Sequence, residues 1–188
     1  MILFFDTEFT GLHKNTTLMT IGIISEDGKT FYSELIDYDK DYVQKEESQW
    51  LQENVVNNFL LDESKYKQGV CYVEGNDWKL RGTKQDLKVH LTKWIEQFDD
   101  VIIWSDCLHY DWVLFIDIFG TAFDVPSNIN YIPRDLCTLF DLLNIDPDIS
   151  REDFAGVSEE QAKLKHNALY DAKIIKLCYD KLISKEGQ

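Results

Sequence analysis

The sequence predicts an α/β domain in which a mixed β-sheet is covered by helices, and three observations support that class. An apolar run at residues 2–5 opens the chain, as expected of a strand buried on both faces. Residues 18–25 and 30–36 form two further strand patterns, joined by an Asp27-Gly28 hairpin signal. Helical patterns then alternate with one more apolar strand and dominate the second half of the chain.

The segments after this three-strand meander are less regular. Residues 37–48 are polar and acidic, which predicts a loop, and residues 49–60 predict a short helix. Residues 69–75 predict a small strand, followed by a turn at residues 76–78.

A helix is expected from Thr83, a residue suited to an N-cap, to about Phe98. Its apolar face consists of Leu87, Leu91, Trp94 and Ile95. Residues 101–104 then form a fourth buried strand, and residues 110–119 form a helix that ends at Gly120.

The last third of the chain predicts helices and an acidic loop. Residues 134–143 form a helix and residues 144–160 a loop. The final helix starts at Ser158 or Lys165 and ends near Ser184. Its inward stripe is Ala168, Ala172, Ile175 and Tyr179. Without an internal repeat or a linker, residues 1–188 are expected to form a single domain.

Composition narrows the class of protein further. A hydrophobic content of 44% predicts a packed globule rather than a disordered chain. The sequence has no run of 18 apolar residues and no leader pattern, so we expect neither a membrane span nor a signal peptide. The four cysteines are scattered without a CxxC pair, which favours a reduced, cytoplasmic protein. The four histidines lack the spacing of a zinc hydrolase.

The net charge of −15 argues at first against a polyanionic ligand. However, residues 65–93 include seven basic and only three acidic residues. Three aromatic residues, Tyr66, Tyr72 and Trp78, lie in the same segment. Such a mixture suits single-stranded nucleic acid, through phosphate pairing and base stacking. The alternative is an ordinary segment whose aromatic side chains pack into the core.

Two acids stand at the end of the first strand. Asp6 and Glu8 are two residues apart, so their carboxylates point to the same side of an extended backbone. Gly11 then lets the chain turn. A divalent cation would relieve the repulsion between the two acids, since it prefers hard oxygen ligands. The alternative is that both acids merely end a strand beside a turn.

Two further acids follow buried elements. Asp111 begins the helix after the fourth strand, and Asp171 lies on the last helix, five residues after His166. Five residues span about 140° around a helix, so His166 shares a cleft with Asp171 only from a loop or a frayed end. Taken singly, Asp111 could be a helix-terminal acid, and Asp171 and His166 could be ordinary surface residues.

Together these motifs resemble the DEDDh superfamily of 3′–5′ exonucleases. The matching motifs are Asp6-x-Glu8-x-x-Gly11-Leu12, Tyr110-Asp111 after a strand, and His166-x-x-x-x-Asp171 in a late helix. Phe9, the sequence Tyr110-Asp111-Trp112-Val113 and residues 126–136 are most similar to small bacterial and phage 3′–5′ exoribonucleases. The resemblance implies a ribonuclease H-like fold, with a five-stranded mixed sheet that begins with three antiparallel strands and is flanked by helices.

One position departs from the superfamily pattern. Many members carry asparagine four residues before the second aspartate, where this chain has Cys107. Asp106 therefore competes with Asp111 for that role. The Tyr110-Asp111 pairing and the apolar helix that follows favour Asp111.

The resemblance implies hydrolysis of single-stranded RNA, or of 3′ overhangs, from the 3′ end. Two Mg²⁺ or Mn²⁺ ions would supply the chemistry. The implied metal ligands, which are also catalytic, are Asp6, Glu8, Asp111 and Asp171. His166 would be the general base, and Phe9, Thr10 and Leu12 would receive the terminal nucleotide.

Several alternatives stay open. The chain could be a 3′–5′ exodeoxyribonuclease, since discrimination between RNA and DNA rests on contacts to a 2′-hydroxyl group. It could be an inactive nucleic-acid-binding module of the same fold, or an endonuclease of the ribonuclease H type. The RNA preference and a homodimer are implied by the resemblance alone.

Overall fold

The computed structural model of the chain describes residues 1–158 and 161–186. Within these ranges seven strands form one mixed sheet, in the spatial order β4-β5-β3-β2-β1-β6-β7. Their bounds are β1 Ile2–Phe9, β2 Leu18–Ser25, β3 Thr30–Leu35, β4 Val70–Glu74, β5 Asp77–Gly82, β6 Ile102–Ser105 and β7 Arg134–Asp135. Strands β1, β2 and β3 form the predicted antiparallel meander.

The expectation of five strands is wrong. The stretch predicted to turn at residues 76–78 begins β5, which pairs parallel with β3 and antiparallel with β4. In β5, Leu80 points into the core whereas Lys79 and Arg81 bind acidic side chains on the other face. The residues of β5 do alternate with the two-residue period of a strand, but only Trp78 and Leu80 are apolar, and the turn-forming residues Asn76 and Asp77 come directly before them. The other addition, β7, has only two residues.

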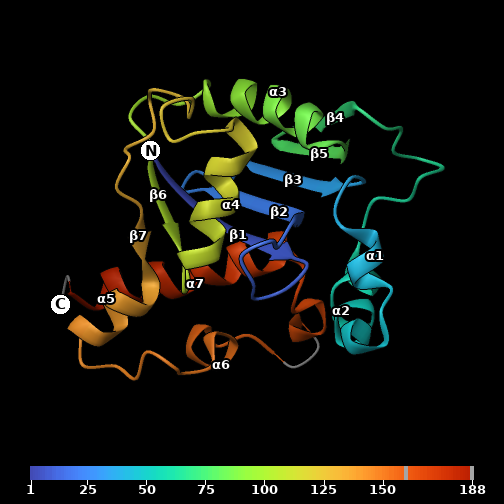
Figure 1. Cartoon of the computed structure of the whole chain (residues 1–188). Coiled ribbons are helices and arrows are strands. Elements are labelled where there is room, and N and C mark those ends of the chain that lie inside the picture. Colours follow the sequence, from blue (N-terminus) through green and yellow to red (C-terminus); the bar gives the residue numbers. More distant parts are fainter. Residues whose placement is uncertain (159–160, 187–188) are drawn as a thin grey trace.

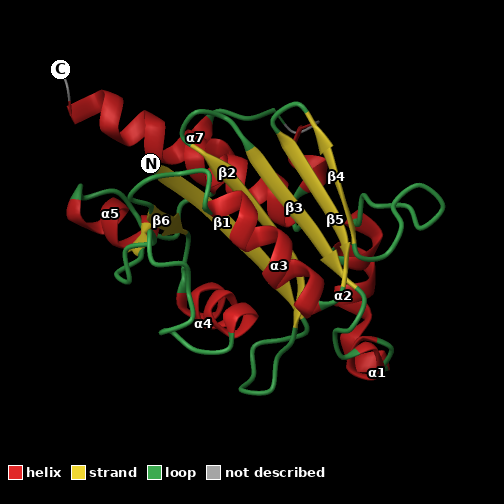
Figure 2. Ribbon diagram, turned by 90° about the horizontal axis from the view of Figure 1, so that it is seen from above, coloured by secondary structure: helices red, strands yellow, loops and turns green. Residues whose placement is uncertain are grey.

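The helices cover both faces of the sheet (Figures 1 and 2). Their bounds are α1 Lys40–Val43, α2 Gln49–Asn54, α3 Lys84–Ile95, α4 His109–Phe119, α5 Leu136–Leu142, α6 Arg151–Ala155 and α7 Ala168–Glu186. Short 3₁₀ helices span Glu46–Ser48, Val56–Asn58 and Gln161–Leu164. The expected loops at 37–48 and 144–160 therefore contain α1 and α6, whose N-caps are Asp39 and Ser150. Residues 159–160, in the second of these stretches, lie outside the described residues.

Two hydrophobic cores lie on opposite faces of the sheet. Helices α3 and α4 pack over one face, where Phe5 of β1 meets Trp94 and Phe115 in the same cluster. Helices α5, α6 and α7 cover the other face around Phe4. Alternate residues of β1 serve opposite cores, as the pleat of a strand requires.

The helix predicted from Thr83 is confirmed at its cap and on its apolar face, although it ends at Ile95 rather than near Phe98. Thr83 and Asp86 form a reciprocal capping box at the start of α3. The predicted apolar face is fully buried: Leu87, Leu91, Trp94 and Ile95. Its position follows from local chemistry because cap and apolar stripe agree.

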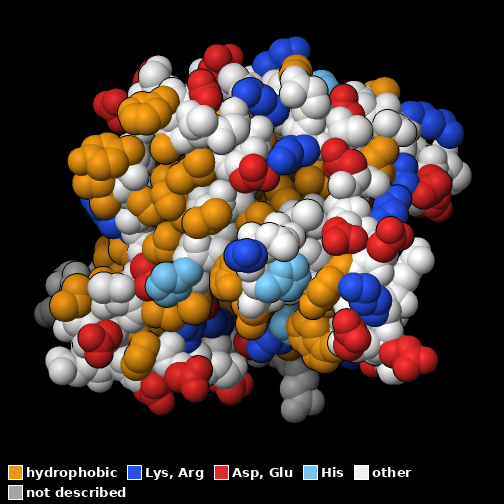
Figure 3. Space-filling model, in the orientation of Figure 1, with side chains coloured by type: hydrophobic (Ala, Val, Ile, Leu, Met, Phe, Trp, Pro, Cys, Tyr) orange, Lys and Arg blue, Asp and Glu red, His pale blue; other side chains and the backbone are white. Residues whose placement is uncertain are grey.

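Hydrophobic side chains gather in the upper left of the surface in the view of Figure 3, apart from a smaller group below and to the right. The upper-left group lies on the side where Figure 1 places α4 and the segment before β7. Val113, Phe123 and Tyr131 are exposed large hydrophobic residues of this part of the chain. Among residues 1–158 and 161–186, no helix is long and apolar enough to cross a membrane.

Candidate active site

The first and second acidic motifs meet because β6 lies beside β1. The two strands run parallel, with Phe4 opposite Trp104, so their carboxyl ends share one edge of the sheet. The chain then turns from β6 into α4, whose first turn carries Asp111. Asp111 is buried, and its Oδ1 accepts hydrogen bonds from the Thr7 backbone N–H, at 3.1 Å, and from the Thr7 hydroxyl. Asp111 is thereby fixed to β1, next to Asp6.

The third motif reaches the same edge through a glycine in β2. Gly22 lies opposite Asp6 in the β1–β2 pair. A Cβ atom at position 22 would lie 2.2 Å from the backbone nitrogen of Leu169 and 2.3 Å from the carbonyl carbon of Ala168. The first turn of α7 therefore rests directly on the β2 backbone, which brings Asp171 toward Asp6. A glycine inside an apolar strand signals such a close approach.

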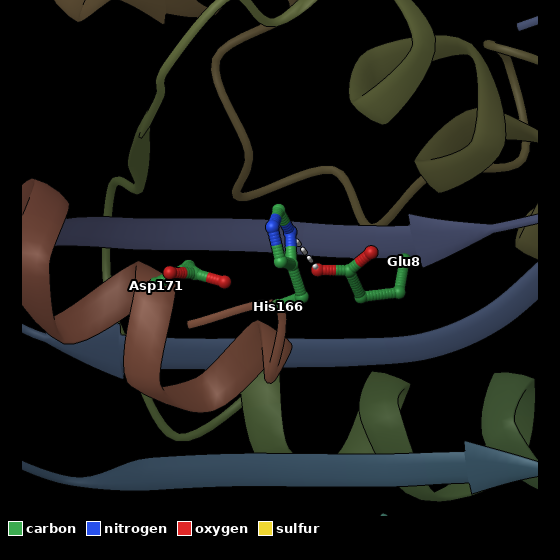
Figure 4. A group of neighbouring side chains, drawn as sticks. All are labelled: Glu8, His166 and Asp171. Atoms are coloured by element: carbon green, nitrogen blue, oxygen red, sulfur yellow. Dashed lines mark ion pairs between the residues drawn. The ribbon is translucent and has the colours of Figure 1, made fainter. Parts of the chain in front are cut away.

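His166 lies in a turn just before α7, as it must in order to share a cleft with Asp171. Its backbone has φ = 65°, in the left-handed region. His166 Nδ1 is 3.8 Å from Glu8 Oε1, and Figure 4 shows the imidazole beside both Glu8 and Asp171. One ligand atom from each of these three residues lies within 4.8 Å of the others.

The site concentrates negative charge that has lost water. Burial raises the pKa of Asp6 well above its ordinary value, and Asp111, Asp171 and Glu8 raise it further by repulsion. Burial, followed by repulsion from Asp171 and Asp111, raises the pKa of Glu8 to about 8. Over the described residues, no lysine or arginine nitrogen lies within 4.0 Å of these four carboxylates.

The pKa values of Asp171, Asp111 and His166 are also shifted, each by its own surroundings. Burial raises the pKa of Asp171 to about 7. Burial also raises the pKa of Asp111, to about 6, although the hydrogen bonds from Thr7 oppose the shift. Burial and then the neighbouring Lys165 lower the pKa of His166, so the imidazole is favoured in its neutral form.

Asp106, the competitor of Asp111, has a counter-ion of its own. The Arg151 guanidinium of α6 contacts both Asp106 oxygens, through Nε at 2.8 Å and Nη2 at 2.9 Å. The Cys137 thiol donates to Asp106 Oδ1 at 3.1 Å. Asp106 lines the same cleft as Asp111, but its charge is neutralised whereas that of Asp111 is not. Asp106 also lies in a group of possible metal ligands with Asp135 and Cys137, but because the charge of Asp106 is neutralised, Asp111 is the better candidate to join Asp6 and Glu8.

The residues expected to receive a nucleotide lie at two adjoining hollows. A cleft of about 710 Å³ contains the four acids, His166, Phe9 and Leu12. A pocket of about 380 Å³ lies beside it, and Glu8, Phe9 and Leu12 line both. Leu12 is 79% exposed, while Phe9 stacks on Tyr110 with ring centroids 5.3 Å apart. Leu12 is therefore free to contact a ligand.

Thr10 differs from its two neighbours because it is fully buried. Its backbone N–H donates to the Thr17 carbonyl at 3.0 Å, and its hydroxyl accepts from the Thr17 N–H at 2.9 Å. Thr10 therefore holds the loop that presents Leu12, and it lines the smaller pocket but not the larger cleft.

Trp50 belongs to the site although its sequence context did not indicate it. This residue of α2 is 53% exposed and lines the smaller pocket. Its ring meets that of His166 edge-on, with centroids 4.8 Å apart. A tryptophan in a predicted short helix is ordinarily a core residue, so only its position in space reveals its exposure.

The basic segment at residues 65–93 forms part of the sheet and of α3. Lys79 lies 3.6 Å from Glu74, and Arg81 pairs with Glu63. Tyr66 is buried and Trp78 packs against the main core. These contacts agree with the alternative reading, in which the aromatic side chains stabilise the fold.

Comparison with known proteins shows the family to which the sequence belongs. No curated protein matches the sequence significantly. One solved structure similar to this chain is the catalytic unit (protease and nuclease domain) of Neurospora crassa Pan2, with 13% identity and a TM-score of 0.46. That alignment covers 98% of this chain and 28% of the Pan2 chain. Residues 1–182 match the 3′–5′ exoribonuclease Rv2179c-like domain, and the chain therefore belongs to that family.

Proposed function

We propose that this chain is a 3′–5′ exoribonuclease that removes single nucleotides from the 3′ end of single-stranded RNA. The observation that carries the proposal is the convergence of four acids from three distant parts of the sequence beside a neutral histidine. Among the residues that the structure describes, none of the four forms an ion pair with lysine or arginine. A structural role would not require so much unneutralised charge, because burying it opposes folding.

The donor set fits divalent cations. It offers carboxylate oxygens, which Mg²⁺ and Mn²⁺ prefer, and their raised pKa values reflect charge that cations would neutralise. Asp6, Glu8, Asp111 and Asp171 would hold two ions. When bound, the ions supply activation of the attacking water and stabilisation of charge on the phosphate and on the leaving oxygen.

The protein's own groups would handle the proton and the substrate. Water attacks the terminal phosphorus, and His166 accepts a proton from that water on its ring, since its lowered pKa keeps it neutral near pH 7. The bond from phosphorus to the 3′ oxygen of the preceding nucleotide breaks, and that oxygen takes up a proton from solvent water. The products are a nucleoside 5′-monophosphate and a chain that is one nucleotide shorter with a free 3′-hydroxyl.

The smaller pocket explains why the enzyme would read a chain end. Its volume of about 380 Å³ suits one nucleotide. Leu12 and Trp50 expose apolar surface at its rim, where a base can stack. Two basic residues line the larger cleft, and both already have acidic partners: Arg151 pairs with Asp106 and Lys165 with Glu152. The phosphate would therefore rely on the bound cations for most of its counter-charge.

The test is digestion of 5′-labelled RNA and DNA of equal sequence with Mg²⁺, Mn²⁺ or EDTA. We expect an RNA ladder that shortens by one nucleotide from the 3′ end with either cation and does not form in EDTA. Asp171→Asn, checked for an unchanged fold by circular dichroism, is the inactive control. Internal cuts would indicate an endonuclease, faster DNA digestion an exodeoxyribonuclease, and binding without cleavage an inactive module. Each of these results would overturn the proposal.

A further inference from the structure

A buried polar network lies behind His166 and connects its turn to the sheet. Its members are Tyr32 and Glu34 on β3, Asn58 at the end of a 3₁₀ helix, and Asn167 before α7. Tyr32, Glu34 and Asn167 are each at most 3% exposed. We refer to these four residues as the Tyr32 network. Because buried polar groups cost free energy unless they are paired, a network of this kind holds its members in place.

Asn58 holds the chain on both sides of His166. Its side-chain Nδ2 donates to the Lys165 carbonyl at 2.8 Å, and its own carbonyl accepts from Asn167 Nδ2 at 3.0 Å. The residues immediately before and after the histidine are thus tied to one residue of a different segment.

Tyr32 extends this attachment into the sheet. Its hydroxyl accepts from Asn167 Nδ2 at 3.0 Å and donates to Glu34 Oε1 at 2.9 Å. The direction is determined by the end groups, since an amide NH₂ only donates and a carboxylate only accepts. Glu34 Oε1 also accepts from the backbone N–H groups of Leu60 and Leu61. The chain of bonds therefore ends in backbone groups.

The conformation of the turn at His166 requires such support, and the network also links the turn to α7. A residue other than glycine with φ = 65° occupies a sparsely populated conformation that persists only where its surroundings impose it. In addition, Asn167 caps α7, since its side-chain Oδ1 accepts from the Tyr170 N–H at 3.2 Å. Asn167 thereby couples the turn with His166 to the helix with Asp171.

We propose that the Tyr32 network positions His166 beside Glu8 and Asp171, so that Tyr32 and Asn58 are positioning residues for the reaction. This inference rests on the proposed function, in which His166 accepts the proton of the attacking water. Neither residue lines the cleft, and both act through the backbone around the histidine.

The kinetic test is Tyr32→Phe, which keeps the buried ring and removes the hydroxyl. We expect kcat to fall at least tenfold with KM unchanged, because small misplacements of a catalytic group cost about that much or more. Tyr72→Phe is the matched control: its ring lies in the same cluster, but its hydroxyl accepts from the Lys67 N–H at 3.1 Å. The control should retain wild-type kcat.

A double-mutant cycle separates positioning from general stability. In a His166→Ala background, Tyr32→Phe should cause no further loss of kcat, since its effect passes through the histidine. An equal loss in both backgrounds, or no loss in either, would overturn the proposal.

An inactive wild type would refute the proposed function but not the positioning of His166. A measurement without substrate tests that positioning independently. NMR of the His166 imidazole should show shifted or broadened signals in Tyr32→Phe and unchanged signals in Tyr72→Phe. Asn58→Ala, at a half-buried position, should reproduce the effect and serves if Tyr32→Phe does not fold. Unchanged His166 signals in the folded variant would overturn the positioning role.

Discussion

Replacing Glu8 with Gln should make the metal-free protein more stable at alkaline pH. The pKa of Glu8 is raised from 4.5 to about 8, first by burial and then by repulsion from Asp171 and Asp111. The folded state therefore binds this proton more tightly than the unfolded state does. The resulting stability is present at low pH and is lost as the pH rises through this interval.

The size of the effect follows from the shift. Between about pH 5 and pH 8, ionisation of Glu8 should lower the free energy of unfolding by on the order of 3 kcal/mol. Glutamine keeps the shape of the side chain and does not ionise, so Glu8→Gln should lose that much less stability over the same range. Added Mg²⁺ or Mn²⁺ should stabilise the wild type at pH 8 and the variant markedly less.

The assay is urea unfolding in EDTA at several pH values. Glu53→Gln, at an exposed position on α2, is the control and should follow the wild-type curve. Parallel pH dependences for the wild type and Glu8→Gln would refute the reasoning, because they would mean that Glu8 is no harder to ionise in the folded protein than in the unfolded one.

The remaining predictions concern other parts of the site. Gly22→Ala should displace α7, because the Cβ atom of the new alanine would meet backbone atoms of that helix. The free energy of unfolding in urea should fall by about 1–3 kcal/mol, and activity should fall at least about tenfold. Wild-type activity would contradict the packing argument. His166→Ala should lower kcat by about 10²- to 10⁴-fold, and a smaller loss would remove it as general base. Trp50→Ala should raise KM for RNA about tenfold or more through lost stacking; an unchanged KM would place the base elsewhere. Arg151→Met should destabilise the fold by about 2 kcal/mol, since it leaves Asp106 unpaired in a partly exposed site; equal unfolding curves would count against that pair.

Much of the fold was predictable because its signals are local. The hairpin at Asp27-Gly28 and the cap at Thr83 each combine a turn or cap residue with a matching hydrophobic period. Strand β5 was missed because its alternation rests on only two apolar residues, Trp78 and Leu80, directly after the turn-forming residues Asn76 and Asp77. The acidic partners of Lys79 and Arg81, Glu74 and Glu63, are supplied by other segments.

For the candidate site, local spacing indicated Asp6 and Glu8, and the resemblance of the motifs to a known family indicated the other residues. The spacing of Asp6 and Glu8 places both on one side of a strand, and the motif order indicated Asp111, His166 and Asp171. Spacing along the chain carries this information because the repeat of a strand or a helix is set by its own backbone.

Only the tertiary structure decided which groups meet. It shows that Gly22 admits α7 to the sheet, that Arg151 neutralises Asp106, and that Asn58 holds the turn of His166. These are contacts between segments tens of residues apart or more, and no local periodicity encodes them. Such contacts arise from close packing and from the pairing of buried charges, which depend on the whole chain being folded.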